Sequence, residues 1–187
     1  MPQTRQQRDR LIEIVRRRSY GTGVQIRLAS GRTSDFYFNM KPTMMDPEGS
    51  HLLARQVLAT ISDLKADLIG GLEMGAVPLA AAVAAVSHAD GTPLPAFFVR
   101  KQAKEHGTRS MIEGLVKGET LAGRSVVVVE DVTTTGGSAL KAIEAIRAEG
   151  GKVLCVVTAV DREEGAADNF RAAGVDFRPV LRVSDFR

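Results

Sequence analysis

The sequence predicts an α/β protein, in which helices flank a parallel β-sheet core and a small N-terminal hood precedes it. Two long apolar runs, RSVVVVE at 124–130 and KVLCVVTAV at 152–160, are rich in valine and contain no charged residue inside them. Strands of this kind are typical of parallel sheets that are buried on both faces. Between them, GGSALKAIEAIRAEGG has apolar residues at helical spacing and ends in glycines. Strands that alternate with helices indicate an α/β fold.

The remaining elements extend this alternation in both directions. An amphipathic helix is expected over 5–18, with Leu11, Ile12 and Val15 on one face, and short strands and turns are expected from 24 to 41. The expected core elements then follow in order: a helix at 49–62, a strand at 66–71, a helix at 76–89, a strand at 95–99, a polar loop at 100–114, the strand, helix and strand described above, a helix near 163–173 and a last strand near 176–183.

A chain of 187 residues suits one domain. We expect residues of about 1–45 to form the hood, which would carry a substrate segment, and residues of about 46–187 to form the α/β core. Ligands of such sheets bind at the carboxyl ends of the strands, so functional residues are expected directly after each apolar run.

Composition and charge exclude several classes of protein. No apolar stretch approaches the roughly 18 residues that suggest a membrane span, and no signal peptide is recognisable, so we expect a cytoplasmic protein without a membrane partner. The net charge of +3 suits nucleic acid or a small polyanionic substrate. The cluster Arg16 to Arg18 is the candidate for RNA contact, although a solvated helix end is the more common role. Cys155, in an apolar run, is expected to be a buried hydrophobe.

The most informative segment is VVVVEDVTTTGGSAL, in which an apolar strand ends in Glu130 and Asp131. A hydroxyl-rich and glycine-rich stretch, 133–138, then opens a helix, and backbone N–H groups at such a helix start attract phosphate. Carboxylates beside a phosphate cradle are explained if they accept hydrogen bonds from sugar hydroxyls or hold a divalent metal. The triphosphate motif GxxxxGK[ST] and the dinucleotide motif GxGxxG are both absent. The alternative is a capped helix beside solvated acids.

This segment resembles the donor-binding motif of type I phosphoribosyltransferases. The resemblance implies that family's fold, with 5-phosphoribosyl 1-diphosphate as the donor. It also implies that Glu130 and Asp131 contact the ribose hydroxyls while the following loop holds the 5-phosphate. The donor-binding residues that it implies here are Glu130, Asp131, Val132, Thr133, Thr134, Thr135, Gly136, Gly137 and Ser138.

The loop RKQAKEHG places four cationic or potentially cationic side chains close together: Arg100, Lys101, Lys104 and His106. Such a group suits a loop that closes over a leaving pyrophosphate, and a solvated surface loop is the alternative. The loop resembles the catalytic loop of orotate phosphoribosyltransferases. The resemblance implies that all four residues bind the donor, and that Lys104, Arg100 and His106 act in catalysis together with Asp131. It also implies a homodimer with shared active sites, because the family's loop reaches the neighbouring subunit.

Two further segments concern the base. ASGRTSDFYFNMK resembles the orotate-binding segment of the same family, which implies that backbone groups near Phe36 and Tyr37 contact the pyrimidine. A strand with inward-facing aromatic residues is the alternative. In AVDREEG, Arg162 could pair bidentately with a carboxylate. The resemblance implies that it binds the carboxylate of orotate, with Thr134 nearby. The alternative is an ordinary salt bridge with an adjacent acid, namely Asp161, Glu163 or Glu164.

The resemblance as a whole implies transfer of phosphoribosyl to orotate in pyrimidine synthesis, with Mg²⁺ held mainly by substrate oxygens and no dedicated metal ligands. Two positions depart from the family, because Ala29 and Gly75 stand where many members have lysine. One rival hypothesis is a phosphoribosyltransferase for another base. Another is a phosphoribosyl-binding regulator of nucleic acid, although the pyrophosphate-handling loop favours an enzyme that has only small-molecule substrates.

Overall fold

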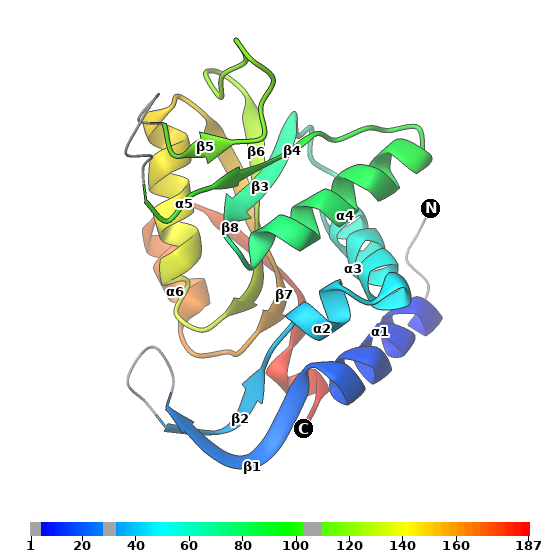
Figure 1. The fold of residues 1–187 in the computed structure, drawn as a ribbon. Coiled ribbons are helices and arrows are strands. Elements are labelled where there is room, and N and C mark those ends of the chain that lie inside the picture. The colour runs from blue at the N-terminus through cyan, green and yellow to red at the C-terminus, as the bar shows by residue number, and fades with distance from the viewer. Residues whose placement is uncertain (1–4, 28–32, 103–109) are drawn as a thin grey trace.

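A six-stranded sheet with helices on both faces forms the body of the protein, and a two-stranded hairpin lies at one end of it (Figure 1). The computed structural model describes residues 5–27, 33–102 and 110–187, without the side chains of residues 24–27 and Thr33. The strand order in the large sheet is β5-β4-β3-β6-β7-β8. All neighbouring strands are parallel except β4 and β5, which pair antiparallel at the edge. The α/β fold class is therefore confirmed.

The strands of the large sheet are β3 (Leu68–Leu72), β4 (Ala96–Val99), β5 (Ile112–Glu113), β6 (Ser125–Thr133), β7 (Lys152–Asp161) and β8 (Asp176–Arg182). The hairpin consists of β1 (Tyr20–Arg27) and β2 (Thr33–Phe38). The helices are α1 (Arg5–Arg18), α2 (Lys41–Met44), α3 (Pro47–Thr60), α4 (Ala76–Ala89), α5 (Gly137–Ala148) and α6 (Ala166–Ala172), followed by a short 3₁₀ helix at Val183–Asp185.

The valine run of β6 explains why this strand lies inside the sheet. Successive side chains of a strand point to opposite faces. Val127 and Val129 accordingly pack in the cluster formed with α1, α3 and α4, whereas Val126 and Val128 pack in the cluster formed with α5 and α6. The strand is thus buried on both faces, as its uninterrupted apolar sequence predicts.

Two of the expected helices, 5–18 and 76–89, have the predicted bounds. The helix expected at 49–62 begins earlier, at Pro47, because the Asp46 carboxylate caps it by accepting a 3.0 Å hydrogen bond from the Gly49 N–H. Three elements were not expected: α2, β5 and the 3₁₀ helix. They are too short for hydrophobic periodicity to reveal them.

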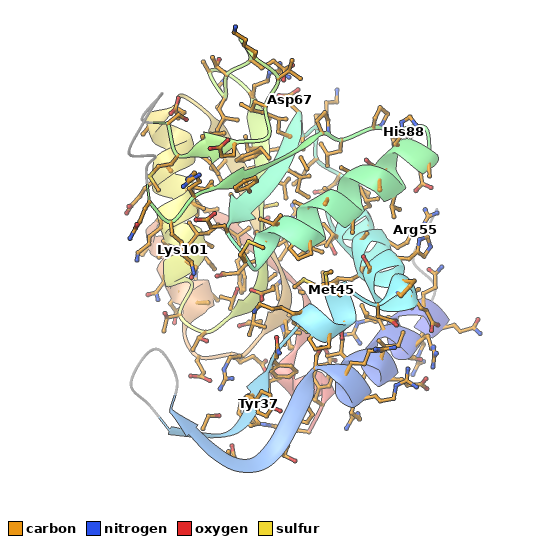
Figure 2. All side chains as sticks on the ribbon, in the orientation of Figure 1. Tyr37, Met45, Arg55, Asp67, His88 and Lys101 are labelled. Carbon is orange, nitrogen blue, oxygen red and sulfur yellow. The ribbon has the colours of Figure 1, made fainter. Side chains whose placement is uncertain are left out.

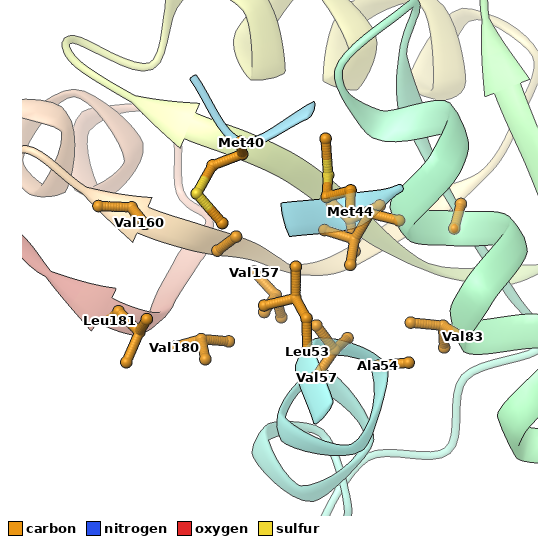
Figure 3. Packing of buried hydrophobic residues seen from close by; sticks show 14 of the residues in the cluster. Met40, Met44, Leu53, Ala54, Val57, Val83, Val157, Val160, Val180 and Leu181 are labelled. Atoms are coloured by element: carbon orange, nitrogen blue, oxygen red, sulfur yellow. The ribbon is translucent and has the colours of Figure 1, made fainter. Parts of the chain in front are cut away.

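The hairpin is attached to the body by side chains. The Tyr20 and Phe38 rings lie 5.5 Å and 5.1 Å from the Phe186 ring, measured between ring centroids. The segment after the hairpin is anchored more deeply, because Met40 and Met44 are buried among residues of α3, β7 and β8 (Figure 3). These anchors fix α2 beside the carboxyl edge of the sheet. None of the described helices is long and apolar enough to cross a membrane.

Candidate active site

Polar residues of the elements at the carboxyl edge of the sheet surround one cavity of about 290 Å³. Its lining includes residues of β6, the loop after β3, the segment after β4 and α2. Its polar lining consists of the carboxylates Glu73, Glu130 and Asp131, the ammonium groups Lys41 and Lys101, and the Ser138 hydroxyl. Opposite charges therefore meet at the edge where an α/β sheet binds its ligands.

The two acids lie inside β6 rather than after it, since the strand continues to Thr133. Glu130 is half-buried, and its Oε2 accepts a 3.0 Å hydrogen bond from the Thr133 hydroxyl. Burial raises the pKa of Glu130 to about 7, the Asp131 charge adds to this, and hydrogen bonds from Thr133 and Ser138 oppose it. Glu130 is therefore a carboxylate held in a place that disfavours its charge, which suits a group that gains hydrogen-bond donors when a ligand binds.

The loop from Thr133 to Ser138 has the backbone that a phosphate cradle needs. Gly136 has φ = 84°, and a Cβ there would lie 2.6 Å from the Phe170 ring, so both the conformation and the space require glycine. The Asn169 side chain donates a 2.8 Å hydrogen bond to the Thr135 carbonyl and so fixes the loop. At the start of α5, Gly137 and Ser138 are exposed, and the first N–H groups of a helix have no intrahelical partner. These amides are available to an anion.

The loop after β3 lies unusually close to the acids. A Cβ on Gly75 would lie 2.3 Å from the Oδ1 atom of Asp131, and a Cβ on Gly71 would lie 2.1 Å from the Val129 carbonyl oxygen. Any larger residue at position 75 would displace Asp131. The departure from the family at Gly75 thus has a steric basis, since a lysine at this position fits only if the Asp131 side chain moves.

The segment after β4 starts the cationic loop. The Lys101 N–H donates a 2.9 Å hydrogen bond to the Glu73 carboxylate, and its side chain lies beside α5 (Figure 2), where it lines the cavity. Arg100 is directed elsewhere: its guanidinium lies 3.6 Å from the Glu113 carboxylate of β5 and donates to the Gln102 carbonyl. Lys104 and His106 lie outside the described residues.

Arg162, at the end of β7, is buried against Phe36, with its guanidinium carbon 4.4 Å from the ring centroid. Its Nε donates to Glu164 at 2.8 Å and its Nη2 donates to the Ser34 hydroxyl at 3.0 Å. The alternative of an ion pair with an adjacent acid is therefore realised with Glu164. Such a pair does not exclude a ligand carboxylate, which would share the guanidinium or displace Glu164 from it.

The other two acids beside Arg162 have backbone partners. Asp161 accepts a 2.9 Å hydrogen bond from the Glu163 N–H, and Glu163 accepts one of 3.1 Å from the Ser184 N–H. Burial raises the pKa of Asp161. The guanidinium is thus left with Glu164 as its acidic neighbour within the described residues.

The end of β7 and the loop after β6 meet at one backbone contact. The Arg162 N–H donates a 2.9 Å hydrogen bond to the Thr133 carbonyl, so Arg162 lies next to the loop that contains the half-buried Thr134. Phe36 is buried against the arginine, whereas Tyr37 is exposed on the hairpin (Figure 2) and covers Gly21. The structure thus brings together Phe36, Thr134 and Arg162, and it directs the Tyr37 ring away from them.

The features that suggested other functions have structural roles. Arg16 donates to the Phe186 carbonyl at 3.1 Å, and Arg18 forms a 2.6 Å ion pair with Asp46, so these two side chains hold the fold together. Cys155 is fully buried, and burial raises the pKa of its thiol to about 12. It is the packing residue that the sequence predicts.

Two cavity residues, Lys41 and Glu73, were not singled out from the sequence. Glu73 directly follows a strand of the core, which is a signal that could have identified it. Lys41 ends the quoted base-binding segment, but its position at the cavity depends on the path of the chain through α2.

Comparisons with known proteins agree on one family. Residues 49–175 match the model of the phosphoribosyl transferase domain. An orotate phosphoribosyltransferase of Bradyrhizobium sp. is 61% identical over 179 residues, which cover 96% of each chain. The structure of Mycobacterium tuberculosis orotate phosphoribosyltransferase with Fe(III) dicitrate has a TM-score of 0.82 and 41% identity, covering 96% of this chain and 98% of that one. The same enzyme in complex with 5-phospho-α-D-ribosyl 1-diphosphate has a TM-score of 0.78 and 38% identity, with the same coverage.

Proposed function

From the premise that the chain belongs to the orotate phosphoribosyltransferase family, we propose that it transfers the phosphoribosyl group of 5-phosphoribosyl 1-diphosphate to orotate. The products are orotidine 5′-monophosphate and pyrophosphate, and the reaction belongs to pyrimidine biosynthesis. The observation that carries this proposal is the 2.9 Å hydrogen bond from the Arg162 N–H to the Thr133 carbonyl. It joins a cation that suits the orotate carboxylate to the loop that suits the donor phosphate.

The donor is proposed to bind along the strand and helix around Glu130. The 5-phosphate accepts hydrogen bonds from the amides and hydroxyls of the 133–138 loop. Glu130 and Asp131 accept hydrogen bonds from the ribose hydroxyls, which increases the stability of their charged forms. Arg100 and Lys101 start the loop that stabilises the departing pyrophosphate, and we assign Lys104 and His106 to the same task from their place in the motif.

The base is proposed to lie between Arg162 and the hairpin. Arg162 binds the orotate carboxylate, with Thr134 beside it, and backbone groups near Phe36 and Tyr37 contact the ring. The bond from the sugar to the diphosphate loosens to an oxocarbenium-like state, and a ring nitrogen of orotate attacks from the opposite face. Positioning and electrostatic stabilisation supply most of the rate enhancement, with no covalent nucleophile required.

Mg²⁺ is proposed as the cofactor. Glu130 and Asp131 provide the hard carboxylate oxygens that Mg²⁺ accepts from proteins, and this ion commonly takes one or two carboxylates together with substrate phosphates. We propose that donor oxygens form most of the shell, as is common for this ion when it binds with substrate phosphates. When bound, the ion offsets the negative charge that develops on the leaving diphosphate.

We also propose a cytoplasmic homodimer with shared active sites. The support for the dimer is the resemblance of RKQAKEHG to a loop that serves the neighbouring subunit in the family. The support for the location is the small-molecule substrates and the sequence features given above.

The first experiment mixes the purified protein with orotate, the diphosphate donor and Mg²⁺ and follows the ultraviolet absorbance of orotate. We expect a loss of absorbance that requires all three components. Turnover of another base but not of orotate would contradict the proposed role of Arg162. Inactivity with every base, together with salt-sensitive nucleic-acid binding, would favour the regulator.

A further inference from the structure

We propose that Lys41 is an additional donor-binding residue whose ammonium group contacts the diphosphate of the donor. This inference rests on the proposed function and extends it to a residue that lies outside both the phosphate motif and the cationic loop. It follows from the charges that line the 290 Å³ cavity, from the way in which α2 is held, and from the steric restriction at Gly75.

The cavity has too little positive charge for a diphosphate. Its lining contains three carboxylates, Glu73, Glu130 and Asp131, and two ammonium groups, Lys41 and Lys101. The ligand adds further negative charge, which is repelled by every carboxylate that remains ionised. Lys41 therefore supplies half of the fixed positive charge that the described residues bring to this cavity.

The backbone at Lys41 is fixed although its side chain is exposed. Met40 and Met44, on either side of it, are 0% and 3% exposed and pack in the core (Figure 3). The Thr43 hydroxyl forms a 2.6 Å buried hydrogen bond with the Ser19 hydroxyl. The Lys41 N–H donates to the Asn39 side chain at 3.3 Å. The residue is thus held in place before any ligand binds, which reduces the entropy lost on binding.

The Lys41 ammonium is not engaged by the fold. Within the described part of the chain it forms no ion pair, whereas most arginines of the hood do, for example Arg10 with Glu48 and Arg18 with Asp46. An exposed lysine that lines a cavity and lacks a structural partner is available to a ligand anion.

The loop after β3 cannot supply this charge. A Cβ at position 75 would lie 2.3 Å from the Asp131 Oδ1 atom, so a lysine in this loop would require the Asp131 carboxylate to move. A cation that serves the same part of the donor must come from another element. Among the described residues, α2 provides one, because Lys41 lines the same cavity as Glu73 and Gly75.

The test compares Lys41→Ala and Lys41→Arg with the wild-type enzyme and with Lys152→Ala. Lys152 is an exposed lysine at the start of β7, at the opposite edge of the sheet, and serves as the matched control. For each protein we would measure kcat, the KM values for donor and orotate, the Kd of pyrophosphate in the presence of Mg²⁺, and the thermal midpoint.

We expect Lys41→Ala to raise the donor KM and the pyrophosphate Kd by about tenfold, as for the loss of one charged hydrogen bond, and to leave the orotate KM within about twofold. Lys41→Arg should restore most of the loss, and Lys152→Ala should behave as wild type. Unchanged donor KM and pyrophosphate Kd in a folded, active Lys41→Ala would overturn the inference, and so would an effect on orotate alone. An inactive wild-type enzyme would instead contradict the proposed function, while pyrophosphate binding would still report on Lys41.

Discussion

The proposed donor side and the proposed base side of the cavity region are built in different ways. The donor side is one continuous stretch, in which β6 leads through the 133–138 loop into α5. The base side is assembled from Phe36 on β2, Thr134 in the loop after β6 and Arg162 at the end of β7. A continuous stretch has its geometry set by local backbone, so a sequence pattern can identify it. An assembled site exists only once distant segments have packed together.

The two sides also differ in how their charges are balanced before a ligand binds. On the donor side, Glu130 is held where burial disfavours its charge and raises its pKa to about 7. On the base side, Arg162 already has the Glu164 carboxylate, the Ser34 hydroxyl and the Phe36 ring as neighbours. The donor therefore relieves an unfavourable interaction, whereas the base competes with a favourable one. Two substitutions test this contrast, and a third, away from both sides, gives a reference for it.

The largest effect is expected for Arg162→Lys. Lysine cannot form the bidentate contact or the planar stacking on Phe36 that arginine provides, so kcat/KM for orotate should fall about 100-fold. The affinity for the donor should stay within about twofold, because the Arg162→Lys substitution leaves the 133–138 loop intact. Steady-state kinetics with each substrate varied in turn would check this, with Arg171→Lys, an exposed arginine of α6, as the control. Equal losses for both substrates would show that the two sides are not separable.

Two smaller effects of opposite sign are expected for Glu130→Gln, a loss of donor affinity and a gain of stability. Donor affinity should fall about tenfold, because glutamine is a weaker acceptor for the ribose hydroxyls than a carboxylate. The free protein should gain about 2 kcal/mol in its free energy of unfolding at pH 8, because the variant no longer buries a charge. Denaturant titrations and donor-binding measurements on the same samples would check both.

The pH dependence of Glu130 follows from its raised pKa. Its folded-state pKa of about 7 lies above the ordinary value of 4.5, so its stabilising contribution is fully present below about pH 4.5 and is lost as pH rises through 7. The stability advantage of Glu130→Gln should therefore grow between pH 5 and pH 8. Donor binding by the wild-type enzyme should weaken as pH falls below 7, and this slope should be shallower in the variant, in which only the donor phosphates titrate in this range. An identical pH dependence in both proteins would contradict the assignment.

The smallest effect is expected away from both sides, at Gln56 on α3. This residue is 1% exposed, and neither atom of its side-chain amide has a hydrogen-bond partner among the described residues. Gln56→Leu should raise the free energy of unfolding by about 1 kcal/mol, since an unsatisfied buried amide is costly. Both substrate affinities should stay unchanged. Gln6→Leu, at an exposed position of α1, is the control and should have little effect on the unfolding midpoint in urea.

The sequence predicts the parts of this protein that depend on local pattern. The valine run of β6 and the spacing of α4 follow from periodicity, and the glycine-rich turn before α5, our proposed phosphate cradle, follows from its contiguous motif. Tertiary placement decides the rest. Lys41 becomes a cavity residue only through the burial of Met40 and Met44. The acidic partner of Arg162 could not be chosen among the three adjacent acids until the backbone around Glu163 was known.

Gly75 is a second case in which the sequence alone does not reveal a tertiary contact. In the sequence, Gly75 is notable because it stands where many family members have lysine. In the structure, it is the residue that allows the loop after β3 to approach Asp131. A close approach between two segments leaves no periodic pattern in the sequence, because only one of the two contacting residues differs from the residue that is usual at its position.

The hairpin of β1 and β2 forms a sheet of its own, joined to the body by packed aromatic side chains rather than by a shared ladder. Packed side chains tolerate substitution better than ladder hydrogen bonds tolerate insertion or slippage. In a lineage of duplicated copies, the hairpin can therefore diverge while the strand and loop proposed to bind the donor are inherited unchanged. New preferences among bases can arise this way, through substitutions in the hairpin that leave the six-stranded sheet intact.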